Sequence, residues 1–374
     1  MSAYRQCTMT ILDTLDDPNM QFDENGVCHY ATDYFERVAR EMGPLEKRTA
    51  ELKAKIEQMK KDGQNKPYDC ILGLSGGTDS SFMALWAHEQ NLRPLVVHLD
   101  NGWNSELAVK NIENICSRLG FELHTHVIDW REFRDLQLAY LKASVVDIEV
   151  LTDHAIQAVI LDLAAKYKIK YSLSGYNLVT EAIMPKGWTY DKRDFLNIKD
   201  IVKQYGGITR FKTFPTLTFS KKLYYHWIVN LESVYVLNYL DYNKDKAKQR
   251  LIDELGWRDY GGKHYESVFT KFYQAYILPQ KFGIDKRKAH LSNLICSGQI
   301  TREEALREME QPLYDPYELA EEKEYVLKKF GLSEVEFDNI MATPPRNHQE
   351  FDSDERLWKR YYKIAGLKRA FSRK

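Results

Sequence analysis

The segment 75–80 is the part of the chain whose residue types and spacing most clearly indicate chemistry. It separates a short apolar run from a helix-like stretch, and backbone N–H groups converge on an anion in such a strand-to-helix turn. Adjacent glycines have no Cβ to keep a phosphate away, serine hydroxyls add donors, and a carboxylate here implies a cation beside the phosphates. We therefore predict polyphosphate binding by Ser75, Gly76, Gly77, Thr78, Asp79 and Ser80. An ordinary Gly-Gly turn is the alternative; a Walker loop is excluded because no Gly-Lys-Ser/Thr follows.

Two other turns are expected to bring polar residues to the same place. The apolar runs 95–99 and 171–174 read as strands, and the turns after them begin near Asp100 and Gly175. Ligands of parallel α/β sheets bind beyond the carboxyl ends of the strands, so both turns should face the loop. For the first turn, the alternative is a plain connection to a helix that Ser105 caps. We predict nucleotide contacts from Asp100, Asn101, Gly102 and Gly175, substrate contacts from Trp103 and Asn177, and a carboxylate in the cleft from Glu181.

The densest group of basic residues lies between positions 259 and 290. A cleft that stabilises pyrophosphate as a leaving group needs cations facing it, and a histidine there could hold substrate or move a proton. A solvated basic surface is the alternative. We predict catalytic roles for Lys263 and His264, and substrate contacts from Glu266, Lys271, Lys286 and Arg287.

The elements that must position these residues alternate between strand and helix from residue 68 onward. This alternation predicts an α/β fold with a doubly wound parallel sheet. Strands are expected at 70–74, 95–99, 123–128 and 171–174, with helices at 45–61, 81–89, 105–119 and 155–167. We expect four segments: a turn-rich and helical N-terminal part (1–64), the α/β core (65–185), a substrate-binding and mostly helical region (186–345) and a basic tail (346–374).

Composition narrows the possible classes of protein. The 374 residues are 44% hydrophobic, which is ample for a buried core. A formal net charge of −1 gives no global basic field that would recruit nucleic acid. The apolar segment 224–239 is too short and too polar to span a bilayer, and the N-terminus has no apolar signal segment. Five cysteines without such a signal indicate free thiols in a reducing cytoplasm.

The end of the chain allows two interpretations. Residues 356–374 contain eight Lys or Arg and no acidic residue, with aromatic side chains interleaved at near-helical spacing. One interpretation is a helix that lies on an anionic surface, either a membrane or an acidic partner. The other is a closing helix whose aromatic side chains pack on the body of the protein while its lysines face water. Gly366 interrupts a continuous amphipathic helix and favours the packed helix.

The order Ser-Gly-Gly-x-Asp-Ser resembles the PP-loop of N-type ATP pyrophosphatases, which cleave ATP between its α- and β-phosphates. Four further stretches look like those of N-acetyl sugar amidotransferases from lipopolysaccharide O-antigen and nonulosonic acid pathways. They are NGWNSELA (101–108), YGGKHYES (260–267), LPQKFGIDKRKAHLS (278–292) and ITREEAL (300–306).

This resemblance implies an ATP-dependent conversion of the N-acetyl group of a nucleotide-linked sugar to an acetamidino group. It also implies Mg²⁺ held by Asp79 and Glu181, a set that matches the one or two carboxylates this ion usually takes. The family works with separate glutaminase and ammonia-channel subunits that resemble the histidine-biosynthesis pair. In agreement, none of the five cysteines lies in a Gly-x-Cys-x-Gly elbow or at the N-terminus, where a glutaminase nucleophile would be expected.

One departure from the family concerns its two N-terminal Cys-x-x-Cys pairs, a zinc-ribbon-like pattern. Here each pair keeps its first cysteine, Cys7 and Cys28, whereas Thr10 and Ala31 stand at the second positions. Two cysteines do not make a closed tetrahedral site. Zinc on Cys7 and Cys28 is therefore the weaker interpretation, and free structural thiols are the stronger one.

Two other functions stay open at this point. A tRNA-thiolating or tRNA-amidating PP-loop enzyme would need a basic RNA-binding face, which the net charge disfavours. A non-catalytic nucleotide-binding subunit would not need the complete 75–80 motif.

Overall fold

The computed structural model describes residues 4–260 and 266–364, and within these ranges five strands form one parallel sheet. They are β1 (Cys70–Gly73), β2 (Pro94–Asp100), β3 (Leu123–Val127), β4 (Tyr171–Ser174) and β5 (Glu232–Tyr235). Their order is β3-β2-β1-β4-β5, so the chain winds outward in both directions from β1. The predicted doubly wound α/β fold is confirmed, and the C-terminal ends of β1 and β4 meet at one edge.

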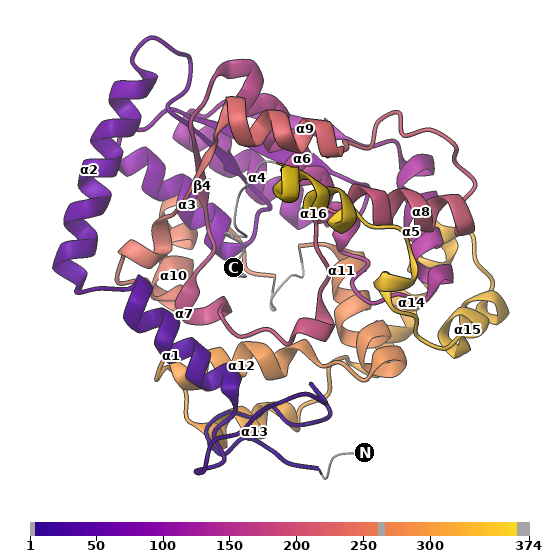
Figure 1. Cartoon of the computed structure of the whole chain (residues 1–374). Helices are drawn as coiled ribbons and strands as arrows, with labels where there is room; N and C mark the ends of the chain where they lie inside the picture. Colours follow the sequence, from indigo (N-terminus) through magenta and orange to yellow (C-terminus); the bar gives the residue numbers. More distant parts are fainter. Residues whose placement is uncertain (1–3, 261–265, 365–374) are drawn as a thin grey trace.

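The central strands supply a separate core on each face of the sheet, because successive side chains of a strand point to opposite sides. Ile71 and Val97 belong to one core, whereas Leu72 and Val96 belong to the other. The first face is covered by α5 (Trp130–Ala143), α6 (Val150–Tyr167) and α8 (Phe195–Tyr205). The second face is covered by α2 (Leu45–Gly63), α3 (Thr78–Glu89), α4 (Glu106–Leu119) and α10 (Lys244–Leu255). Figure 1 shows how these helices surround the sheet.

Several helix ends follow from local sequence. The Ser105 hydroxyl accepts from the Ala108 N–H at 3.1 Å, and α4 stops at Gly120 with φ +67°. Capping boxes at Thr301 and Ser333 begin α13 (Arg302–Met309) and α15 (Glu334–Ala342), as their sequences predict. By contrast, α1 (His29–Glu41) begins inside the part expected to be turn-rich.

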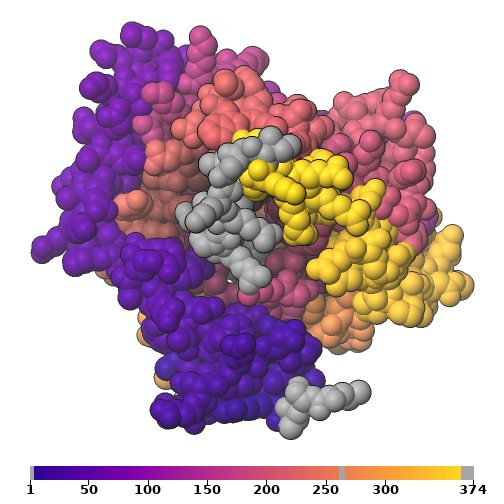
Figure 2. Space-filling model, in the orientation of Figure 1, coloured from indigo at the N-terminus to yellow at the C-terminus, as the bar shows by residue number. Residues whose placement is uncertain are grey.

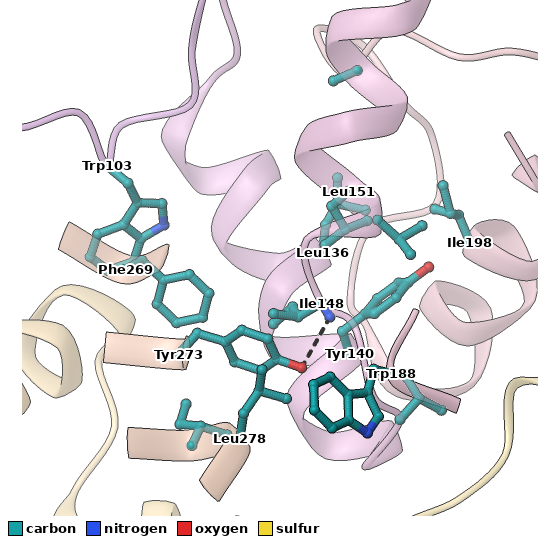
Figure 3. Close-up of a cluster of buried hydrophobic side chains, with 14 of the residues drawn as sticks. Trp103, Leu136, Tyr140, Ile148, Leu151, Trp188, Ile198, Phe269, Tyr273 and Leu278 are labelled. Carbon is teal, nitrogen blue, oxygen red and sulfur yellow. Dashed lines mark hydrogen bonds between the residues drawn. The ribbon is translucent and has the colours of Figure 1, made fainter. Parts of the chain in front are cut away.

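The C-terminal half packs against the first face of the sheet. It consists mainly of α11 (Val268–Phe272), the π-helical η4 (Tyr273–Phe282), α12 (Lys286–Cys296), α13, α14 (Pro316–Phe330) and α15. Figure 3 shows the aromatic contact between the two halves: Trp103 stacks on Phe269 at 5.1 Å, and Tyr273 faces the corner between α5 and α6. The Tyr273 hydroxyl accepts from the N–H groups of Asp147 at 2.8 Å and Ile148 at 3.5 Å.

The N-terminal segment, residues 4–28, contacts residues that are far from it in the sequence. Residues 4–28 pack beside α12 and α13, where Figure 1 shows the indigo segment below these helices. Lys288 pairs with Asp13 at 2.7 Å and with Asp16 at 3.0 Å. The Arg302 side chain donates to the carbonyl of Thr10 at 3.1 Å.

The described part of the basic tail (346–364) ends in the helix α16 (Glu355–Ile364), which packs on the body of the protein. Trp358 meets Phe219 of α9 (Phe219–Tyr224) edge-to-face at 5.0 Å. The indole N–H of Trp227, in the π-helical η2 (Tyr225–Val229), donates to the Tyr361 hydroxyl at 2.7 Å. Figure 2 shows α16 in yellow on this face of the molecule. These contacts favour the closing-helix interpretation up to residue 364. None of the described helices is both long and apolar enough to cross a membrane.

Candidate nucleotide-binding site

The 75–80 loop leaves β1 at the edge where β4 also ends, and its backbone is held by two aromatic side chains. The carbonyl of Gly76 accepts from the indole N–H of Trp257 at 2.8 Å and from the hydroxyl of Tyr260 at 2.9 Å. Gly76 has φ +87°, and a Cβ there would lie 2.8 Å from the Tyr260 oxygen. Only glycine fits this position without strain. Sequence reasoning did not identify Trp257 or Tyr260 as loop supports, because neither is close to the loop along the chain.

The loop presents a group of donors around the start of α3. Among the described residues, no side chain caps the N-terminus of this helix, so its first N–H groups can serve an anion. The hydroxyls of Ser75 and Ser80 lie 3.1 Å apart, and the Gly77 N–H donates to Ser75 Oγ at 3.3 Å. In this state the two serines bond to each other and to the loop. A phosphate could take over these donors without a change of fold.

The two predicted magnesium ligands lie beside the loop. Asp79 is in the first turn of α3 and accepts a hydrogen bond from the Tyr242 hydroxyl. Glu181 ends the short helix α7 (Leu178–Glu181). The pKa of the Tyr242 phenol is raised by burial first, then by the charge and hydrogen bond of Asp79, and to a smaller extent by the charge of Glu181. A Cβ at Gly175 would lie 3.4 Å from the Cβ of Asp79, so the turn after β4 packs directly on the loop.

This arrangement fits Mg²⁺, which commonly combines one or two carboxylates with phosphate oxygens. The described residues contain no cluster of three or more His, Cys, Asp or Glu that could hold a metal by themselves. Asp79 and Glu181 would therefore need phosphate oxygens to complete the coordination.

Hydrogen bonds from its own polar side chains hold the turn after β2 in place. Asp100 Oδ1 accepts from the Gly102 N–H at 2.9 Å, and Asn101 Nδ2 donates to Thr152 Oγ1 of α6 at 3.1 Å. Gly102 has φ +84°, and a Cβ there would lie 2.9 Å from the Trp130 ring. His98, which was not predicted, bridges to the loop strand through the Leu74 carbonyl at 3.1 Å. Its burial lowers the pKa of His98.

The predicted substrate contacts separate into two groups. Glu266 reaches the loop, since a Cβ at Gly77 would lie 3.4 Å from its Oε1. Trp103 is only 1% exposed and donates its indole N–H to Gln137 at 2.6 Å, so it has almost no surface for a ligand. Asn177 is buried and accepts from the Val179 N–H at 2.9 Å, which makes it the N-cap of the helix that carries Glu181. Lys263 and His264 lie outside the described residues.

The other predicted cations are paired with carboxylates, and this corrects their interpretation as free charges facing pyrophosphate. Buried Lys271 pairs with Glu318 and Glu322, the latter at 2.8 Å. Lys286 pairs with Glu149 at 2.9 Å. Arg287 pairs with Asp285 at 2.7 Å and donates to the Gln311 carbonyl at 2.8 Å. The partners of the two lysines are too far along the chain to be recognised in a local run of basic residues, whereas Asp285 is two residues from Arg287.

The two N-terminal cysteines form a hydrogen-bonded pair of buried thiols. Cys7 Sγ accepts from the N–H groups of Cys28 at 3.2 Å and Thr10 at 3.3 Å. A hydrogen bond from Cys28 lowers the pKa of the Cys7 thiol. Thr10 Oγ1, at the position of a lost ligand, lies 3.6 Å from Cys28 Sγ. A hydroxyl and two thiols do not fit the donor set of a structural zinc site.

Chelation is therefore expected to leave the thermal stability of the protein unchanged. Scanning calorimetry with and without EDTA, in the absence of ATP, measures this. The matched control is the double variant Thr10→Cys/Ala31→Cys, which has four thiols and should take up zinc and become EDTA-sensitive. A fall of several degrees in the Tm of the unmodified chain on chelation would contradict the assignment of free thiols.

Comparison with known proteins adds to this geometry. Residues 266–365 match a family described as "LPS biosynthesis protein WbpG-like, C-terminal domain". A tRNA(Ile)-lysidine synthase from Chlamydia pneumoniae is 37% identical over 71 residues, which are 18% of this chain and 22% of that protein. With its 75–80 loop, the chain is thus similar to PP-loop ATP pyrophosphatases over part of its length.

The match to the lysidine synthase spans less than a quarter of that protein's length. An NH₃-dependent NAD synthetase from Campylobacter jejuni, solved with nitrate, aligns with 56% of this chain and 84% of its own chain at 16% identity, and the TM-score is 0.30.

Proposed function

We propose that this PP-loop protein is an ATP-dependent amidotransferase that converts the N-acetyl group of a nucleotide-linked sugar to an acetamidino group. The observation that carries the proposal is the occurrence, in one chain, of a PP-loop flanked by Asp79 and Glu181 and of a WbpG-like C-terminal domain. The domain suggests lipopolysaccharide biosynthesis, and the loop suggests AMP-forming chemistry. A cytoplasmic location, where ATP is available, is part of this proposal.

The chemistry requires activation of a poor electrophile. The acetamido oxygen attacks the α-phosphorus of ATP, the bond to the β-phosphate oxygen breaks, and pyrophosphate leaves. Ammonia then attacks the carbon of the resulting imidate and expels AMP, so one C–O bond is exchanged for a C–N bond. Both steps need the polyphosphate held in one orientation.

Different residues of the site would carry out different parts of the proposed reaction. The N–H groups at the start of α3 and the hydroxyls of Ser75 and Ser80 would bind the departing pyrophosphate. Asp79 and Glu181 would hold Mg²⁺, which neutralises negative charge that develops on the phosphates. Trp257 and Tyr260 keep the loop backbone in place through the Gly76 carbonyl. Glu266, beside Gly77, would contact the sugar substrate.

Free ammonium is expected to support the reaction, whereas glutamine alone is not. The reason is that Cys7, Cys28, Cys70 and Cys116 are all buried, and none of the five cysteines has the sequence context of a glutaminase nucleophile. Mass spectrometry of nucleotide N-acetyl sugars incubated with ATP, Mg²⁺ and ammonium should detect a product about one mass unit lighter, formed with AMP. Release of glutamate by the purified chain would show that the proposed separate glutaminase is unnecessary.

A second candidate function is tRNA modification, which the match to a tRNA(Ile)-lysidine synthase favours. The formal net charge of −1 disfavours it, because RNA binding usually needs a basic surface. The same assay with total tRNA in place of the sugar separates the two candidates. AMP formation that depends on tRNA, and not on an N-acetyl sugar, would replace the first proposal with the second.

A further inference from the structure

A cavity of 1190 Å³ lies between α16, α9, η2 and the 190–194 loop that precedes α8. It is larger than most sites for a single small molecule. Its lining combines aromatic rings, cations and carboxylates, and α16, visible in yellow in Figure 2, forms one wall. None of the roles proposed above uses this cavity.

One wall of the cavity is formed by polar side chains that contact one another. Lys222 pairs with Asp354 in the interior, and Lys222 Nζ also donates to the Arg193 carbonyl at 2.9 Å. The Asp354 side chain is only 4% exposed, yet its Oδ1 has no hydrogen-bond partner among residues 4–260 and 266–364. A buried acceptor without a partner is costly, so Asp354 Oδ1 marks a place for a ligand hydroxyl or N–H.

The α16 wall supplies a ring and unpaired cations. The Trp358 ring is fixed edge-to-face on Phe219 at 5.0 Å and stacked on Tyr362 at 5.7 Å. Arg356 and Lys363 line the same cavity, and within the described ranges neither forms an ion pair with a carboxylate. An aromatic surface, two available cations and a buried acceptor together match a ligand that has a planar ring, an anionic part and hydroxyl groups.

The loop that lines the cavity also contacts the nucleotide-binding edge of the sheet. Arg193 lines the cavity, while the neighbouring Lys192 pairs with Asp153 of α6 at 3.3 Å. One residue earlier in α6, Thr152 accepts from Asn101 in the turn after β2 at 3.1 Å. A short series of contacts thus joins the cavity to the edge where the PP-loop lies.

We propose that this cavity binds the nucleoside diphosphate part of the sugar substrate. Arg356 and Lys363 would bind the diphosphate, Trp358 would stack on the base, and Asp354 Oδ1 would accept from a hydroxyl. The identity of the complete substrate rests on the proposed amidotransferase function; the nucleoside diphosphate site itself does not.

The test measures nucleoside diphosphate affinity by calorimetry, with the PP-loop site saturated by α,β-methylene-ATP and Mg²⁺. The probes are the nucleoside diphosphates UDP, GDP, dTDP and CDP, with uridine and inorganic pyrophosphate as partial ligands. The variants are Arg356→Glu and Lys363→Glu, and the matched control is Arg360→Glu, an exposed position on the same helix outside the cavity lining.

At least one probe is expected to bind, and each cavity variant should weaken it about ten-fold or more while Arg360→Glu leaves it within about two-fold. Tm values close to that of the unmodified protein exclude unfolding as the cause. No binding of any probe, or equal losses in all three variants, would overturn the cavity assignment. Failure of the amidotransferase assay alone would not, since nucleotide binding is measured separately.

Discussion

Replacing Asp79 by alanine is expected to abolish release of AMP and pyrophosphate while the protein stays folded. Asp79 lies in the first turn of α3 beside Gly175, where we propose that it holds Mg²⁺ against the phosphates together with Glu181. Losing several kcal/mol of charge stabilisation should slow turnover by at least about a thousand-fold. Pyrophosphate release with ATP, ammonium and an N-acetyl nucleotide sugar measures the effect, and thermal melting checks the fold.

The matched control removes the contact of Asp79 but keeps its carboxylate. Tyr242→Phe deletes the hydroxyl that donates to Asp79 and should retain most of the activity. If Asp79→Ala turned over ATP at the normal rate, Asp79 would not be a metal ligand. If Tyr242→Phe were as inactive as Asp79→Ala, the hydrogen bond rather than the carboxylate would be the essential feature.

Replacing Trp103 by alanine is expected to lower the free energy of unfolding by about 3–5 kcal/mol. The ring is almost completely buried, stacks on Phe269 and lies under the ammonium group of Lys329, 4.5 Å from its centroid. Figure 3 shows it beside Phe269 in the aromatic contact between the two halves of the chain. Urea unfolding followed by circular dichroism measures the change.

Trp227 provides the control for the same substitution at the surface. It is 56% exposed, and its recorded polar contact is with Tyr361, so Trp227→Ala should cost about 1 kcal/mol or less. A Trp103→Ala protein of normal stability but raised KM for the sugar would instead restore Trp103 as a substrate contact.

The sequence allowed the sheet and the loop to be predicted because both depend on neighbouring residues. Apolar runs followed by glycine turns define β1 and β2, and Ser105 and Gly120 define the ends of α4. The strand β5 was missed, since Glu232–Tyr235 is short and sits in an aromatic, polar region. The roles of Lys271 and Lys286 depended on Glu318, Glu322 and Glu149, which only folding brings near.

The attachment of residues 4–28 to α12 and α13 has a consequence for synthesis of the chain. Asp13 meets Lys288, 275 residues later, and Thr10 meets Arg302, 292 residues later. Residues 4–28 therefore leave the ribosome long before α12 and α13 and must wait for these helices, and closing so long a loop delays the contacts further. During that interval the thiols of Cys7 and Cys28 are not yet buried. The period when these thiols are open to oxidation is set by the time needed to translate the C-terminal half.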